Sequence, residues 1–334
     1  MPTPPKPSTP VVLHAPADAV LAAPLMLGYW PDNSLCAIFV DAEHRVVLIM
    51  RWDADAQAAI PALPPMLPGE TVPGTVHLVA YTSSPPPGAP PAAPDRSAWR
   101  HAERTLHDSG MSLGWILVAG RHGDSVPWTC VEGQGSELDV RVIAGLQVAR
   151  QAQRWGLPPW RSTRRDYIGD IATDPIALHH VVEELRKAPP AVEEAMRDAA
   201  IGAVRDRLAC GDISPFAVAA TLVALADVRV RDTLLWDLMQ EEASTWPAIA
   251  EWMARVVAAA PETHVAAPAT LLAILRWQMG DGSRASAAVE RALAADPAYT
   301  LAALVDRCLT TGMHPSVWRA GLADLSREDC RRAA

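Results

Sequence analysis

Lysine is almost absent from this chain of 334 residues. Lys6 and Lys187 are its only lysines, and the rest of its 29 basic residues are arginines. Acidic residues number 38, so the formal net charge is −9 at pH 7. This acidic balance argues against electrostatic binding of nucleic acid or of an anionic membrane by the protein surface as a whole. Any basic binding site must therefore be local.

Cysteine is also scarce and shows no framework pattern. The five cysteines are far apart, none forms a CxxC pair, and their number is odd. This pattern speaks against a set of disulfides and against a zinc site built from cysteines. The five are Cys36, Cys130, Cys210, Cys308 and Cys330.

Long apolar runs are missing as well. The longest runs, 111–120 and 216–226, suit a buried strand and a buried helix. Both fall short of the roughly 18 residues that a membrane-spanning helix needs. Residues 1–10 (MPTPPKPSTP) lack the apolar core of a secretory signal. We therefore expect no membrane partner and a cytoplasmic location.

Apolar residues are abundant enough for two domains. Half of the residues are hydrophobic, and a chain of this length can bury two cores. Of the 31 prolines, 19 precede residue 95, which indicates that the loops are concentrated in the first part of the chain. In the second part the prolines mark helix starts, where proline is tolerated.

Residues 11–155 predict an α/β domain. Five apolar segments separated by turn residues have the length and composition of strands. The predicted strands are 34–40, 45–52, 75–81, 112–119 and 125–130, and the predicted helices are 17–28, 53–62, 95–108 and 136–155. This order gives a mixed five-stranded β-sheet with flanking helices.

Four further segments surround or interrupt the domains. We expect a disordered leader over 1–10, a Pro/Ala loop over 83–94, a linker over 156–170 and a tail over 323–334. The Pro/Ala loop (SSPPPGAPPAAP) has a composition that favours an extended, solvated chain over a packed one.

Residues 171–322 predict an all-helical domain, so the fold class is α+β with an all-α second domain. The predicted helices lie near 175–187, 190–209, 215–226, 230–242, 246–259, 267–279, 283–295 and 298–311. Within this domain, residues 267–297 resemble one tetratricopeptide repeat, with Gly280, Ala285, Val289, Ala292 and Pro297 on consensus positions. This repeat-like hairpin favours an interaction role.

Asp32, Arg51, Asp53 and Asp55 form the first candidate ligand or metal site. They lie at the ends of two predicted strands, where α/β domains often bind ligands. Two carboxylates in a D-x-D pattern can hold Mg²⁺ beside a phosphate. The favoured interpretation is structural: Asp53 caps the next helix, and Arg51 pairs with Asp53 or Asp32.

Arg150–Tyr167 is a basic stretch with interleaved aromatic residues. Arginine pairs with phosphates and tryptophan stacks on bases, so the stretch suits a nucleotide or an acidic partner. An inter-domain linker pinned by its tryptophans is the favoured interpretation. The candidate contacts are Arg154, Trp155, Trp160, Arg161, Arg164 and Arg165.

Common catalytic signatures are missing. The chain contains no GxSxG, GxxxxGK[ST], SxxK or GxGxxG motif. We therefore assign no catalytic residue, no metal and no cofactor.

Several motifs resemble a known family. They are Leu27–Leu35 (LGYWPDNSL), Arg51–Asp53, Val228–Asp232 (VRVRD) and the segment from Gly280 to Pro297. Together they are similar to the actinobacterial family called domain of unknown function 4192, over residues 15–320. The resemblance implies a cytoplasmic protein of high-G+C bacteria, and G+C-rich coding accounts for the preference for arginine over lysine. It implies no activity, cofactor or catalytic residue.

We therefore expect a non-enzymatic protein-interaction or regulatory module. Its partner is another protein or a second copy of the chain, as in a dimer, whereas nucleic acid is not favoured. The alternative is an enzyme acting on phosphate esters or nucleotides at Asp32, Arg51 and Asp53. A weaker alternative is nucleic-acid binding through Arg150–Tyr167.

Overall fold

The structure is a computed structural model that describes residues 11–53, 74–82, 104, 106–108, 110–122, 125–130, 135–139 and 163–332. The chain divides into two compact units, one ending at Tyr167 and the other beginning at Ile168. The predicted leader 1–10, helix 53–62 and loop 83–94 lie outside the described residues.

The first unit is built on a six-stranded mixed sheet in the order β2-β1-β3-β4-β5-β6. All five predicted strands are confirmed. β3 and β4 are parallel and all other neighbours are antiparallel. The strands are β1 (Ser34–Val40), β2 (Val46–Asp53), β3 (Thr75–Thr82), β4 (Ser112–Gly120), β5 (Ser125–Cys130) and β6 (Gly135–Asp139).

The predicted helix over 136–155 is wrong at its start, because residues 135–139 form strand β6. Ser136 and Asp139 have the spacing of a helix cap, yet the segment pairs antiparallel with β5, in the register Ser125↔Asp139 to Thr129↔Gly135. The edge of β5 supplies backbone hydrogen-bond partners, and Leu138 packs against the core. Residues 141–155 lie outside the described part of the chain.

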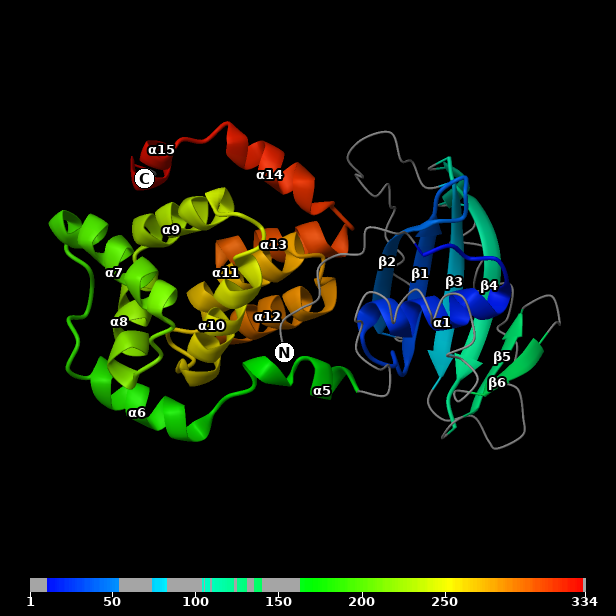
Figure 1. Cartoon of the computed structure of the whole chain (residues 1–334), viewed down its shortest axis with the longest axis horizontal. Helices are drawn as coiled ribbons and strands as arrows, with labels where there is room; N and C mark the ends of the chain where they lie inside the picture. Colours follow the sequence, from blue (N-terminus) through cyan, green and yellow to red (C-terminus); the bar gives the residue numbers. More distant parts are fainter. Residues whose placement is uncertain are drawn as a thin grey trace. The chain divides into compact units, whose positions relative to one another are not determined.

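Helix α1 (Pro16–Leu27) lies across one face of the sheet (Figure 1). Strand β1 is buried over its whole length, and its side chains alternate between the two faces. Cys36, Ile38 and Val40 join the core under α1, whereas Leu35, Ala37 and Phe39 join the core of the opposite face. Both faces of the sheet centre are therefore covered.

A hydrogen bond and a glycine fix the position of α1. The buried Tyr81 hydroxyl donates to the Val20 carbonyl oxygen at 2.8 Å. Gly28 ends the helix with φ of +82°, as the sequence predicted. The ring of Tyr167 lies so close that a Cβ on Gly28 would be 2.6 Å from it. The end of α1 and α5 (Arg164–Tyr167) thus pack against each other.

A bulge between β3 and β4 centres on His77. The register runs from Val76↔Leu113 to Leu78↔Ile116, so Gly114 and Trp115 together oppose His77. The imidazole Nδ1 accepts the Trp115 backbone N–H at 3.0 Å, and the two rings stack at 4.3 Å. The side chain thus satisfies a backbone donor within the irregular part of the ladder.

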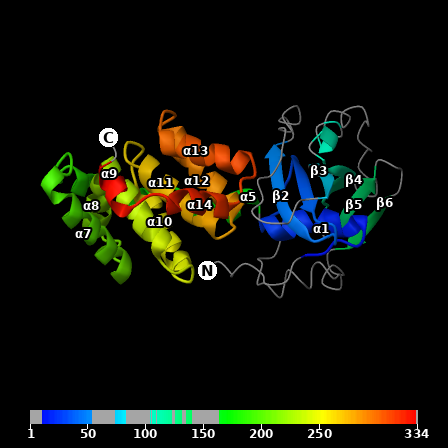
Figure 2. The ribbon, with the colours of Figure 1, turned by 90° about the horizontal axis from the view of Figure 1, so that it is seen from above.

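The second unit is all-helical, as predicted, and its core lies between α6 and α13. Figure 2 shows α7, α8 and α9 side by side, and their contacts agree. The helices are α6 (Pro175–Leu185), α7 (Arg197–Cys210), α8 (Pro215–Ala226), α9 (Val228–Gln240), α10 (Trp246–Ala259), α11 (Ala266–Gln278), α12 (Gly282–Ala295), α13 (Thr300–Thr310), α14 (Pro315–Ala323) and α15 (Arg327–Arg332), with short 3₁₀ turns η2 (Gly169–Ile171) and η3 (Glu194–Met196).

The predicted tail 323–334 contains α15, which packs along α9. Cys330 of this short helix is buried. The apolar pattern of the sequence did not predict this helix, because Cys330 is the only buried residue among its charged ones. None of the helices in the described ranges combines the length and the apolar character needed to cross a membrane.

We predict that Gly114→Ala destabilises the first unit. A Cβ on Gly114 would lie 2.4 Å from His77 Nδ1, so the ring must move and its hydrogen bond to Trp115 must weaken. Overpacking of this kind costs about 1–3 kcal/mol. Gly74→Ala is the matched control, because its Cβ meets nothing closer than 3.9 Å. Chemical denaturation checks both variants, and equal midpoints would contradict the prediction.

We also predict that acid weakens the fold through His77. Burial lowers the pKa of this imidazole from 6.5 to about 4, and the charge of His44 contributes. Between these values the unfolded chain binds a proton that the folded chain excludes. The free energy of unfolding therefore falls as the pH drops from 6.5 to 4, by roughly 3 kcal/mol in total. Denaturation at several pH values should show a shallower slope for His77→Gln, and an unchanged slope would refute the assignment.

Candidate functional site

The structure brings three predicted site residues to one edge of the sheet. In the β1–β2 pairing, Asp53 lies opposite Ser34 and Arg51 lies opposite Cys36. Asp32 precedes β1, and its carbonyl oxygen accepts the Ser34 hydroxyl at 2.8 Å. Asp55 lies outside the described residues, and the Asp53 side chain is not described either. The predicted D-x-D pair is therefore untested.

The expected pairing of Arg51 with Asp53 or Asp32 stays a prediction, and the charges described at this edge involve Asp32, Arg121, Arg51 and Cys36. Partial burial raises the pKa of Asp32, while the charge of Arg121 and a hydrogen bond from Trp30 lower it. The charge of Arg51 acts on Cys36, whose thiol has a pKa raised to about 12 by complete burial. Arg121, which follows β4, was missed from the sequence because its nearness to Asp32 depends on the strand order.

No group of three or more His, Cys, Asp or Glu side chains among the described residues is arranged to hold a metal ion. The sheet edge therefore supplies Asp32 and Arg121 as a partly buried carboxylate and a cation. Such a pair can bind a polar ligand.

The Arg/Trp stretch is described only at its end. Arg154, Trp155, Trp160 and Arg161 lie outside the described residues. Arg164 and Arg165 begin α5, where the Asp166 carboxylate accepts from Thr163. Tyr167 packs on Tyr29 with ring centroids 5.7 Å apart. This end of the stretch thus makes an aromatic contact within the first unit, while the interpretation as a linker pinned by its tryptophans stays a prediction.

In the predicted repeat-like hairpin, α11 and α12 pack side by side. Ala285, Val289 and Ala292 of α12 are fully buried. Gly280 takes a φ of +81° between the two helices, which only glycine adopts without strain. Small residues therefore face the partner helix, while the assignment as a tetratricopeptide repeat stays a prediction.

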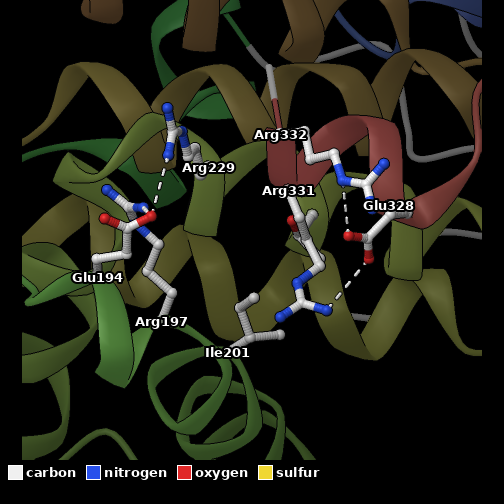
Figure 3. Close-up of a pocket in the computed structure, with 8 residues that line it drawn as sticks. Glu194, Arg197, Ile201, Arg229, Glu328, Arg331 and Arg332 are labelled. Carbon is white, nitrogen blue, oxygen red and sulfur yellow. Dashed lines mark hydrogen bonds and ion pairs between the residues drawn. The ribbon is translucent and has the colours of Figure 1, made fainter. Parts of the chain in front are cut away.

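A hollow of about 210 Å³ lies among α7, α9 and α15. We call it the arginine pocket, because four arginines line it: Arg197, Arg229, Arg331 and Arg332. Figure 3 shows two clusters on opposite sides of the hollow, with Ile201 below and between them. One cluster is Arg197 and Arg229 with Glu194, and the other is Arg331 and Arg332 with Glu328.

Helical spacing places these side chains in the pocket. Arg197 and Ile201 are four residues apart on α7, as Arg229 and Thr233 are on α9, so each pair shares one helix face. Pocket residues also lie in the first two turns of both helices. The N-terminus of α9 is capped by the Asp227 carboxylate, which accepts from the backbone N–H groups of Arg229 and Val230 at 2.9 and 3.1 Å.

The glutamates are held loosely on one side of the pocket and more closely on the other. A Glu194 carboxylate oxygen lies 3.4 Å from Arg197 and 3.7 Å from Arg229, and its side chain is 82% exposed. Glu328 lies 3.0 Å from Arg332 and 3.3 Å from Arg331.

Two further carboxylates hold the arginines from outside the lining. Asp227 accepts from Arg197 Nε at 2.9 Å, and this contact and the N-cap bonds lower the Asp227 pKa against the effect of burial. Asp198 pairs with Arg331. These contacts orient the arginines, while Glu194 and Glu328 are the carboxylates that line the hollow itself.

Thr233 lines the pocket and is fully buried. Its hydroxyl has no hydrogen-bond partner within the described part of the chain. A buried threonine on a helix usually donates to the carbonyl oxygen four residues earlier, as Thr221 and Thr270 do here. Thr233 is therefore a buried polar group without a described partner in the lining of a hollow that combines four arginines with two glutamates.

Asp237 on α9 anchors the α15 wall of the pocket. This buried carboxylate accepts from Arg327 Nε at 2.7 Å and from Nη2 at 3.1 Å, in a fork-like pair. Arg205 of α7 lies 3.5 Å away on the other side. The indole of Trp236 donates to the Leu325 carbonyl oxygen at 3.0 Å. The last described residues are thus tied to α9 by side chains of α9 itself.

One part of the pocket has a recognisable sequence pattern, the VRVRD segment. The VRVRD segment alternates two arginines: Arg229 lines the pocket, whereas Arg231 is buried and donates to the Tyr299 hydroxyl at 2.7 Å. The second wall comes from residues that were expected to form a tail. The segments that line the pocket are about 30 and 100 residues apart, so no short sequence motif marks the pocket.

We predict that Arg327→Ala loosens α15. The variant removes the fork-like pair and leaves Asp237 buried with Arg205, which should cost about 1–3 kcal/mol. Amide hydrogen exchange over 327–332 should become faster. Lys187→Ala is the control, because its exposed pair with Glu184 at 2.7 Å contributes at most about 0.5 kcal/mol. Unchanged exchange in Arg327→Ala would contradict the anchoring role of Asp237.

Comparison with known proteins gives one match. The sequence model of a family described as a domain of unknown function, DUF4192, matches residues 16–316. This range includes Arg197 and Arg229 but ends before α15. Neither the curated proteins nor the solved structures gave a match. Because the match spans most of the chain, the chain belongs to the DUF4192 family.

Proposed function

We propose that this protein is a non-enzymatic interaction module that works in the cytoplasm. Its helical unit holds an anionic group of a partner in the arginine pocket. The observation that supports this proposal is the gathering of four arginines from α7, α9 and α15 around one hollow. Arginine is suited to this role because its planar fork binds carboxylates and phosphates with two hydrogen bonds.

Exposed apolar residues next to pocket arginines in the sequence favour a protein partner over a small ion. Met196 and Val228 each come directly before a pocket arginine, and they are 54% and 51% exposed. Exposed large apolar side chains next to arginine are typical of interface centres. The partner therefore contacts an apolar rim while its anionic group enters the hollow. It is another protein or a second copy of this acidic chain.

Two alternatives remain proposals. An enzyme acting on phosphate esters or nucleotides at the sheet edge has the partly buried Asp32 and the nearby Arg121 in its favour. Nucleic-acid binding through Arg150–Tyr167 has only Arg164 and Arg165 among the described residues. The arginine pocket is favoured because four arginines from three helices meet around one hollow.

Isothermal titration calorimetry at low ionic strength tests the proposal. Hexaglutamate peptide and inorganic phosphate are the probes, and we predict that at least one binds the wild-type chain. Arg229→Glu should weaken binding at least tenfold, because it replaces a pocket cation by an anion. Arg255→Glu is the matched control, since Arg255 is an exposed arginine on α10 outside the pocket lining.

If neither hexaglutamate nor phosphate binds the wild-type chain, the proposal is refuted. Heat released with Mg²⁺ and nucleotide that disappears in Asp32→Asn would favour the enzyme instead. Retention on single-stranded DNA that disappears in Arg164→Ala/Arg165→Ala would favour nucleic-acid binding. Analytical ultracentrifugation of the wild-type chain alone distinguishes a second copy from another protein as the partner.

A further inference from the structure

The buried hydroxyl of Thr233 indicates what kind of anion the arginine pocket takes. This group lines the pocket with no partner among the described residues, although leaving a buried donor unsatisfied costs free energy. A ligand oxygen that accepts from the hydroxyl would recover that cost. The ligand must then reach Thr233 while it also contacts the arginines, which requires several acceptor oxygens pointing in different directions.

The glutamates in the pocket argue against a simple carboxylate ligand. Glu194 is mostly exposed and 3.4 Å or more from its arginines, so an incoming anion can displace it. A carboxylate that takes its place exchanges one single charge for another and gains little. A dianion adds a second negative charge near Arg197 and Arg229, which line the hollow.

The size of the hollow sets an upper limit on the ligand. Its 210 Å³ is smaller than the roughly 300–1,000 Å³ of pockets that enclose a drug-sized ligand. A tetrahedral anion and the first atoms of the group that carries it fit this volume, whereas a whole nucleotide does not. The apolar Ile201 lies between the two charged clusters and suits the carbon atom next to such a group (Figure 3).

We propose that the arginine pocket recognises a phosphate monoester. This inference rests on the proposed function and specifies its ligand. Arg197 and Arg229 hold the phosphoryl oxygens on one side, Arg331 approaches from the other side, and the Thr233 hydroxyl donates to a further oxygen. Glu194 occupies the arginines in the empty pocket and leaves when the phosphoryl group enters. Recognition involves binding alone, with no bond made or broken.

Calorimetry with inorganic phosphate, sulfate and acetate on the full chain tests the ligand class. We predict that phosphate and sulfate bind at pH 7.5 and that acetate does not. Phosphate binding should weaken several-fold at pH 5, because inorganic phosphate is largely a dianion at pH 7.5 and a monoanion at pH 5. Sulfate stays a dianion in this range and should bind equally at both pH values. Acetate binding as tightly as phosphate would overturn the inference.

Thr233→Val tests the hydroxyl directly. The variant keeps the shape and removes the donor, so phosphate affinity should fall about tenfold or more, as expected for a lost hydrogen bond to a charged group. The unliganded variant should melt at a higher temperature than the wild type, because it no longer buries an unsatisfied group. Unchanged phosphate affinity in a folded Thr233→Val would overturn the role of the hydroxyl.

Thr270→Val is the matched control for this variant. Thr270 is also fully buried on a helix, but its hydroxyl donates to the Ala266 carbonyl oxygen at 2.7 Å. Its replacement should lower the melting temperature and leave phosphate binding unchanged. Glu194→Gln is a second informative variant, because removing the displaced charge should strengthen phosphate binding several-fold.

A final set of calorimetric titrations identifies the source of the phosphoryl group. A seven-residue phosphoserine peptide, its glutamate counterpart and free phosphoserine are the probes. Tighter binding of the phosphopeptide than of free phosphoserine assigns the group to a protein, and equal binding assigns it to a small ester. Equal binding of the glutamate peptide and the phosphopeptide would overturn the phosphate inference and leave the proposed function intact. If none of these anions binds, both fail.

Discussion

The arginine pocket depends on one buried carboxylate, Asp237. It lies on α9 between Arg205 of α7 and Arg327 of α15, and its fork-like pair with Arg327 holds the end of the described chain in place. A buried charge of this kind is costly when one partner is missing. The wall formed by α15 is therefore part of the fold of the helical unit, and Arg331 and Arg332 reach the hollow from it. Together with the Trp236–Leu325 hydrogen bond and the Arg331–Asp198 pair, this anchor keeps the arginines of α15 beside those of α7 and α9.

Both units bury polar side chains among apolar residues, but the hydrogen bonds of these side chains differ. In the sheet unit, His77 uses its buried ring to satisfy the Trp115 backbone N–H, so the cost of burying an imidazole is offset by an intact ladder. In the helical unit, Thr233 is buried without a partner in the described residues, and nothing in the backbone requires its hydroxyl. The Nε2 atom of His77 is likewise buried without a partner among the described residues, so a missing partner does not by itself mark a ligand site. Thr233 differs because it lines the arginine pocket, and its place there is why the helical unit carries the functional proposal.

Local patterns predicted most of the elements but not the site. Apolar runs such as 34–40 and 112–119 indicated strands, because each carries enough hydrophobic residues to fill both faces of a sheet. Ser136 and Asp139 predicted a helix start that does not form, because pairing with the free edge of β5 stabilises this segment more than a helix cap does. Asp32 was recognised as a candidate, whereas its neighbour Arg121 depends on strand order. The pocket joins Arg197, Arg229 and Arg331, which come from distant segments, and only tertiary structure brings them together.

The arginine side chains themselves report most directly on the proposed anion site. Arginine Nε–Hε resonances of the full chain can be followed by NMR while inorganic phosphate is added, with Arg255 as an internal reference. The site described here predicts that the Nε–Hε signals of Arg197 and Arg229 shift together and saturate at one phosphate per chain, while Arg255 does not move. A uniform, unsaturable shift of all arginine signals, or no shift at Arg197 and Arg229, would contradict an anion-binding pocket at this position.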